Sequence, residues 1–177
     1  MPEISKTLQP VFTTNFILVT IINLFVFFSF QMIFPTLPLY IKSLGGTDSV
    51  IGLVMGTFMI TSLATRPFAG LALDKIGRKQ VFIIGLVVLG LSAFAYSLAA
   101  SVTMIVFIRL LHGFGWGIAG TATSTVAAEI IPRERFGEGM GYFSMANSLS
   151  LAIAPAAGLY ISHRYGFRDV FMLATVL

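Results

Sequence analysis

Long apolar stretches alternate with short polar ones along the chain. Five of them are long enough, as helix, to cross a bilayer core roughly 30 Å thick. Their approximate limits are 16–40, 50–73, 81–99, 102–127 and 142–162. Between Gln80 and Ala128 the only charged residue is Arg109. Because that run is too long for one crossing, we expect the chain to turn within the small polar stretch 97–103.

A sixth apolar segment opens after Arg168 and Asp169 and has only eight residues, 170–177. Eight helical residues rise about 12 Å, too little to cross. The pattern therefore predicts an all-α membrane protein: a cytoplasmic N-terminal segment, 1–15, and a bundle, 16–177, of five full transmembrane helices and the beginning of a sixth. The first span reads as retained, because the apolar core of a signal peptide is shorter. The chain looks like a polypeptide cut inside its sixth helix.

Composition agrees with lipid as the solvent. Hydrophobic residues make up 56% of the chain and charged residues 10%, which would leave a soluble domain with too much exposed apolar surface. The net charge of +4 comes from bases between apolar runs, as expected for loop charge rather than a nucleic-acid partner. No cysteine is present, and neither His112 nor His163 has an intramembrane acid beside it. We expect no metal site and no cofactor.

Charge in the connections predicts the orientation. Counting alternate connections puts six bases on one side, namely Lys6, Lys75, Arg78, Lys79, Arg133 and Arg135. The other side has three, namely Lys42, Arg164 and Arg168. Cytoplasmic loops carry the excess of Lys and Arg, so we expect a cytoplasmic N-terminus. Arg66 and Arg109 fall within spans and are left out of the count.

The connection after the second span carries the most specific motif. It reads GLALDKIGRK from Gly70 to Lys79. Gly77 permits a tight turn, and Arg78 can fork onto a carboxylate. The glycines at 70 and 77, Asp74, and the bases at 75, 78 and 79 match the loop between helices 2 and 3 of major facilitator superfamily transporters, which the chain resembles.

The resemblance implies a conformational latch loop, made of Gly70, Asp74, Lys75, Gly77, Arg78, Lys79 and Glu129. In the family the acid of this loop faces a helix start in the C-terminal half. The arginine joins an acid that ends helix 4, about where Glu129 stands here. The alternative is a snorkelling loop that only orients the protein, which explains the bases but not the acid between the glycines.

The fourth span contains Arg109, an expensive residue in a membrane. Insertion costs about 2.5–3.5 kcal/mol, so such an arginine normally faces the bundle interior or a water-filled cavity, although it could also snorkel outward. It resembles an arginine of the family's helix 4, which implies substrate or proton handling. Gly113, Gly117 and Gly120 recur on one face, where another helix can approach closely. His112 reads more simply as a packing residue.

The fifth span partly matches the helix 5 motif of proton-driven exporters. Gly141, Pro155 and Gly158 match, whereas Ser150, Ala154 and Leu159 stand where the family usually has glycine. Pro155 removes a backbone donor and kinks a helix, and small neighbours allow close packing. Export is favoured, and a kinked packing helix without directional meaning stays open. The whole resemblance covers about 16–171 and is closest in pattern to bacterial drug/proton antiporters.

In this fold the substrate site lies near the midplane between two halves. The resemblance implies that helices 1, 4 and 5 face it, so the candidate contacts for substrate or proton handling are Asn23, Phe27, Phe30, Gln31, Arg109, Tyr142 and Asn147. No carboxylate occurs within the first spans. A proton site would then be a rim acid (Asp74, Glu129, Glu134 or Glu138), an acid of the other half, or an arrangement centred on Arg109.

We therefore expect a secondary active transporter of the bacterial cell membrane, working by alternating access, that couples a proton gradient to efflux of small molecules or drugs. Its partners would be a small-molecule substrate, the lipid bilayer, and a C-terminal half or a second copy of the chain. Sugar or metabolite uptake and an inactive or homodimeric half-transporter stay open. An intramembrane hydrolase is disfavoured, because Ser124 and His112 lie about 18 Å apart along one helix and cannot pair. The reading frame after Leu177 would separate a two-half transporter from a half-length one.

Overall fold

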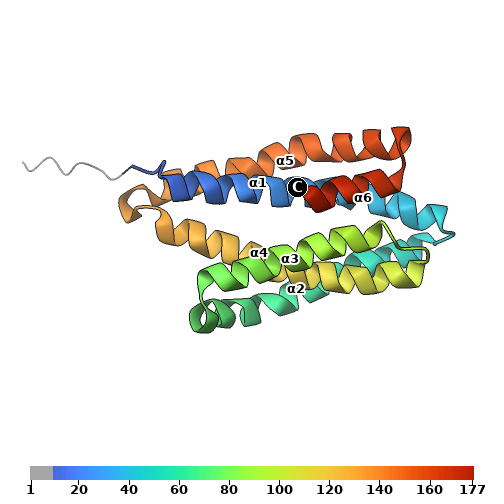
Figure 1. Cartoon of the computed structure of the whole chain (residues 1–177), viewed down its shortest axis with the longest axis horizontal. Helices are drawn as coiled ribbons and strands as arrows, with labels where there is room; N and C mark the ends of the chain where they lie inside the picture. The colour runs from blue at the N-terminus through green and yellow to red at the C-terminus, as the bar shows by residue number, and fades with distance from the viewer. Residues whose placement is uncertain (1–9) are drawn as a thin grey trace, which may run out of the picture.

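The computed structural model describes residues 10–177 (Figure 1). Within that range the chain forms six α-helices and one short 3₁₀ turn. These elements are α1 (Thr14–Ser43), α2 (Asp48–Ile76), α3 (Arg78–Tyr96), α4 (Val102–Ile130), η1 (Arg133–Arg135), α5 (Phe136–Arg164) and α6 (Phe167–Val176). Five of the helical segments are long and apolar enough to cross a membrane. The expected all-α bundle with five spans is confirmed, and a sixth helix of ten residues, α6, follows them.

Polar side chains and glycines set the helix ends. Thr13 and Ser101 cap α1 and α4, where their hydroxyl oxygens accept hydrogen bonds from the backbone N–H of Phe16 (3.2 Å) and Met104 (3.3 Å). These bonds satisfy donors that the first turn of a helix leaves free. Gly77 alone separates α2 from α3, and its φ of 107° lies in the region that favours glycine. The expected break near 97–103 is found between Tyr96 and Val102.

Several helices extend beyond the apolar stretches that predicted them. The α5 helix begins at Phe136, six residues before the expected limit at 142. Its first turn contains Glu138, which pairs with Arg135 at 2.6 Å. A polar first turn at the bundle end adds helix without adding hydropathy, which is why hydropathy places this boundary too late. Lys6 and most of the predicted 1–15 segment lie outside the described residues.

The helices form two groups along the bundle. Figure 1 shows α1, α5 and α6 in one layer and α2, α3 and α4 in the other, with connections at alternate ends. The α1 helix packs mainly against α5, whereas α4 packs against both α2 and α3, and α6 contacts α3 and α1. A buried cluster that includes Ile33, Tyr96, Ile105 and Phe171 joins the two layers at the end where α6 begins.

Glycines allow the closest helix contacts. A Cβ on Gly113 would lie 2.7 Å from the carbonyl oxygen of Phe58, and one on Gly117 would lie 2.7 Å from that of Ser62, both in α2. A Cβ on Gly158 would likewise lie 2.6 Å from the carbonyl oxygen of Met32 in α1.

Gly120 corrects the prediction of a three-glycine packing face. No heavy atom of a neighbouring helix lies within 4 Å of a Cβ built there, because the space beside it is part of a cavity. The pair at 113 and 117 therefore marks the α2 contact, and Gly120 does not belong to it.

Candidate functional site

A charged cluster joins the ends of three helices at the α2–α3 turn. The Arg78 side chain at the start of α3 donates from Nη2 and Nε to Glu129 Oε1 near the end of α4, at 2.9 and 3.1 Å. Its Nη1 donates to the carbonyl oxygen of Leu73 at 2.9 Å and lies 3.4 Å from Asp74 Oδ1. The turn at Gly77 allows this, because it starts α3 directly beside the end of α2. The cluster thus ties α2, α3 and α4 together at one point.

The remaining residues of the predicted latch loop point outward. Asp74 has 73% of its side chain exposed, so it contacts Arg78 from one side only and presents its carboxylate to the surroundings. Lys75 and Lys79 are exposed, and the space beside Gly70 is open. The structure therefore brings together Asp74, Arg78 and Glu129, and leaves the two lysines apart from that group. Whether this cluster acts as a latch stays a prediction.

Arg109 is fully buried between α4 and α2. Its guanidinium carbon lies 4.4 Å from the centre of the Phe58 ring, Nη2 contacts Met55 Sδ at 3.4 Å, and Nη1 lies 3.5 Å from His112 Nδ1. Its Nε has no hydrogen-bond partner within residues 10–177. The attraction of a cation to an aromatic face accounts for part of its stabilisation there.

Arg109 faces the bundle interior, which was one of the expectations for it, and it neither lines the cavities described below nor snorkels outward. It lies behind the Phe58 ring, which lines the largest cavity described below. The close approach of α2 at Gly113 brings Phe58 over the arginine, and no sequence spacing reveals such a contact. Its part in substrate or proton handling stays a prediction.

Stacked aromatic rings cross the middle of the bundle. The Phe30 ring from α1 stacks on Trp116 from α4 with centroids 4.2 Å apart, and on Phe58 from α2 at 5.2 Å. His112 lies edge-on to Phe30 and Phe58 and contacts the hydroxyl of Tyr96 at 3.3 Å. Rings from three helices therefore separate the space on one side of α1 and α4 from the space on the other.

The largest of the cavities described here, about 680 Å³, lies between α1, α2, α4 and α5. We call it the main cavity. Its lining is mostly apolar and includes Phe30, Gln31, Phe58, Arg66, Trp116 and Pro155. A second space of about 220 Å³, the polar cavity, is lined partly by Asn23, Phe27, Arg66, Trp116, Gly120 and Asn147. Arg66 and Trp116 line both, so the two spaces share a boundary.

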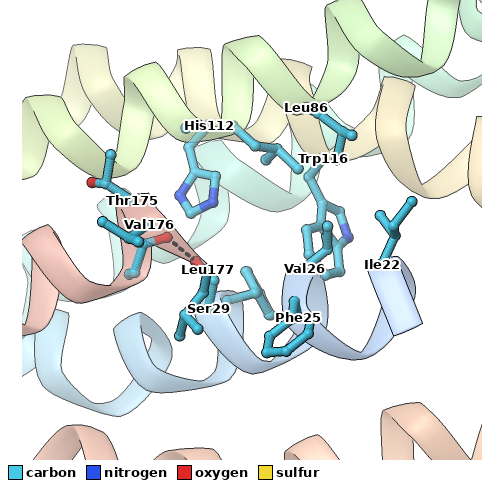
Figure 2. A pocket seen from close by; sticks show the side chains of 14 residues that line it. Ile22, Phe25, Val26, Ser29, Leu86, His112, Trp116, Thr175, Val176 and Leu177 are labelled. Carbon is cyan, nitrogen blue, oxygen red and sulfur yellow. Dashed lines mark hydrogen bonds between the residues drawn. The ribbon is translucent and has the colours of Figure 1, made fainter. Parts of the chain in front are cut away.

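A further cavity of about 340 Å³ lies on the other side of the stacked rings, between α1, α3, α4 and the end of α6. Figure 2 shows His112 and Trp116 directed into it from one side and Ser29, Val26 and Ile22 of α1 from the other. The Ser29 hydroxyl donates to the carbonyl oxygen of Ala174 at 2.7 Å, which fixes α6 against α1. This cavity is lined mainly by apolar side chains.

Five of the predicted cavity contacts line these spaces, namely Asn23, Phe27, Phe30, Gln31 and Asn147. Asn23 Nδ2 donates to Asn147 Oδ1 at 2.7 Å, so the two amides link α1 to α5 as well as lining the polar cavity. Tyr142 does not line them and packs instead on Phe12, with ring centroids 4.9 Å apart. It lies in the second turn of α5, closer to the bundle end than the predicted span suggested.

Three cavity residues were missed by the sequence interpretation: Phe58, Trp116 and Arg66. The first two belong to apolar stretches in which any aromatic residue reads as lipid-facing or core. The sequence shows that Met59, Ser62 and Leu63 precede Arg66 at helical spacing, so the four residues lie on one face of α2. The structure shows that this face lines the main cavity.

The fold defines a bundle of helices long and apolar enough to cross a membrane, with an aromatic cavity and a charged cluster at one end. The model of the Major Facilitator Superfamily matches residues 19–177, and the chain belongs to that superfamily. It is 33% identical over 156 residues to multidrug resistance protein 2 of Bacillus subtilis (strain 168), covering 88% of this chain and 39% of that protein. It is 28% identical over 155 residues to the quinolone resistance protein NorA of Staphylococcus aureus (strain Mu50), covering 85% of this chain and 40% of that protein. The chain therefore spans about two fifths of the length of these curated relatives.

Proposed function

We propose that the chain is the N-terminal half of a bacterial secondary active transporter that exports small molecules or drugs by alternating access, driven by a proton gradient. The main cavity carries the proposal: a space of about 680 Å³ with aromatic rings on its walls and few polar groups suits varied, largely apolar compounds. The names of the two relatives, which refer to multidrug and quinolone resistance, agree with export.

The coverage of the relatives suggests that a second half completes the site. Along α2 and α5 the main cavity is bounded by Met59, Leu63 and Leu151, which are strongly exposed apolar side chains. A second bundle packed over this face would close the cavity and bury that surface. The partner is then a C-terminal half encoded after Leu177 or a second copy of the chain.

Transport by the whole protein is the direct test. Inside-out vesicles that contain it should accumulate a cationic dye such as ethidium when their lumen is made acidic, and the accumulation should collapse when the pH gradient is discharged. Uptake of a sugar without any dye movement would instead favour the alternative of metabolite import. A gene that ends after Leu177 and whose product moves nothing would support an inactive half-bundle.

The orientation follows from the position of the bases. The end of the bundle with Arg78, Lys79 and Arg133 carries most of the loop charge, so we propose that it lies in the cytoplasm. The chain has no cysteine, so Lys79→Cys introduces a single thiol into it, and any cysteine of a second half would first be replaced. In intact cells a membrane-impermeant maleimide should leave the Lys79→Cys variant unlabelled and should label it after lysis. A Ser43→Cys variant, with its thiol at the opposite end of the bundle, should react in intact cells. The reverse pattern would contradict the orientation.

Asp74 tests whether the charged cluster takes part in transport. We propose that its exposed carboxylate binds a helix start of the second half in one state of the cycle, where the positive end of a helix dipole stabilises an anion. Asp74→Asn in the whole protein should reduce dye export severalfold, while membrane insertion stays normal.

The matched control for Asp74 is Asp48→Asn at the other end of the bundle. Asp48 is also an exposed acid, 85% exposed, and pairs with Lys42 at 2.9 Å. Export should remain near wild type in the control. Wild-type export by Asp74→Asn, with both variants at equal levels in the membrane, would mean that this loop only orients the protein.

A further inference from the structure

Arg66 is a cation within the membrane-spanning part of α2, and no acid among residues 10–177 pairs with it. It lies ten residues before the end of the helix at Ile76, about 15 Å along the axis. Its side chain is exposed, and within residues 10–177 it makes no ion pair and no hydrogen bond. The other intramembrane arginine, Arg109, is fully buried and cannot reach a molecule in the cavity without a rearrangement.

The surroundings of Arg66 face the cavities. Together with Ser62 it lines the main cavity, whose walls also include Trp116 of α4 and Pro155 of α5. It also lines the polar cavity beside Asn147 and Thr121. Neither lining contains a carboxylate of the described chain. Among the residues that line these two cavities, Arg66 is the one with a charged side chain.

We propose that Arg66 is the binding residue for the acidic group of a ligand, and that the main cavity favours aromatic carboxylic acids and zwitterions over matched neutral or ester compounds. An exposed guanidinium can bind both oxygens of a carboxylate, and such a bond gains strength where water is scarce. The aromatic part of the same ligand would stack against Trp116 and Phe30, and the Asn147 amide is available to a second polar group. This inference rests on the proposed function and names the substrate class of that cavity.

A pair of dyes isolates the carboxylate. Rhodamine B carries a carboxylate and a cationic xanthene ring, and its ethyl ester keeps the ring and the cation but loses the acid. Binding of each dye to the purified whole protein, followed by fluorescence polarisation, should show tighter binding of the acid by about tenfold or more, as expected for hydrogen bonds to a charged group. Arg66→Gln should abolish that preference and leave the affinity for the ester unchanged, while Arg66→Lys should keep part of it.

The thermal unfolding midpoint reports whether the Arg66 variants are folded, and Arg133→Gln is the matched control. Arg133 is an exposed arginine at the bundle end and is remote from both cavities, so its loss should leave the preference for the acid intact. Equal binding of acid and ester by the wild-type protein would overturn the inference. So would an equal loss of both dyes in an Arg66→Gln protein whose thermal unfolding midpoint matches wild type, which would indicate that Arg66 pairs with an acid of the protein. The proposed function stands in either case as long as the whole protein still exports ethidium, and fails separately if it does not.

Discussion

Gly117→Val is expected to destabilise the bundle by about 1–3 kcal/mol or more, the usual cost of forcing extra atoms into a packed contact. A Cβ at this position would lie 2.7 Å from the carbonyl oxygen of Ser62 and 2.8 Å from Thr65 Cβ. The nearer atom belongs to the backbone of α2, so it cannot move aside as a flexible side chain can. The two helices would have to separate, and with them the Phe58 ring that covers Arg109.

Gly120→Val provides the control in the same helix. It adds the same side chain three residues later, where no atom of a neighbouring helix lies within 4 Å of the new Cβ. Thermal unfolding of the detergent-solubilised protein should show a clearly lower midpoint for Gly117→Val and a midpoint close to wild type for Gly120→Val. Equal midpoints for Gly117→Val and wild type would mean that α2 and α4 are not held as closely as described.

Hydropathy was enough to predict the architecture, because a membrane imposes a minimum length on each apolar helix. The five spans follow from that constraint, and the small polar stretch 97–103 gave the place of the break between Tyr96 and Val102. The boundaries were less accurate where charged residues continue a helix beyond the apolar core, as Glu138 does in the first turn of α5. Hydropathy identifies the part of a helix that can lie in lipid, whereas the end of the helix is set by its last backbone hydrogen bonds.

The candidate site was only partly predictable. The contact of Arg78 with Glu129 was anticipated, because the motif at the α2–α3 turn resembles a known pattern. The stacking of Phe30 on Trp116 and the contact of Arg109 with Phe58 were not, since they depend on how α1 and α2 are rotated against α4. In a chain that is apolar on every face, periodicity carries little information about rotation. The positions of glycines were the best available guide to which helix face packs closely. They predicted the contact with α2 correctly at Gly113 and Gly117 but not at Gly120.

Arg109→Leu is expected to separate stability from transport. Within residues 10–177 no carboxylate pairs with this buried guanidinium, and its Nε lacks a hydrogen-bond partner. On insertion scales an arginine at the centre of a membrane helix costs about 2.5–3.5 kcal/mol, which is an upper value for Arg109, seven residues after the start of α4 at Val102. Leucine removes that cost and fits the apolar surroundings of Met55 and Phe58, so the thermal midpoint should stay level or rise.

Transport should change in the opposite direction. If the cation is retained because the cycle needs it, Arg109→Leu should reduce proton-driven dye export at least tenfold, while Arg109→Lys, which keeps the charge without the planar fork, should retain more activity than leucine. Leu111→Ala is the matched control, because this neighbour is 42% exposed and lies outside the contacts of the arginine. Export and thermal midpoint, measured on the same preparations, decide whether Arg109 serves transport or packing. A parallel loss of both in Arg109→Leu would show that the arginine serves the packing of α2 on α4, and that proton handling must be sought at the rim acids or in the second half.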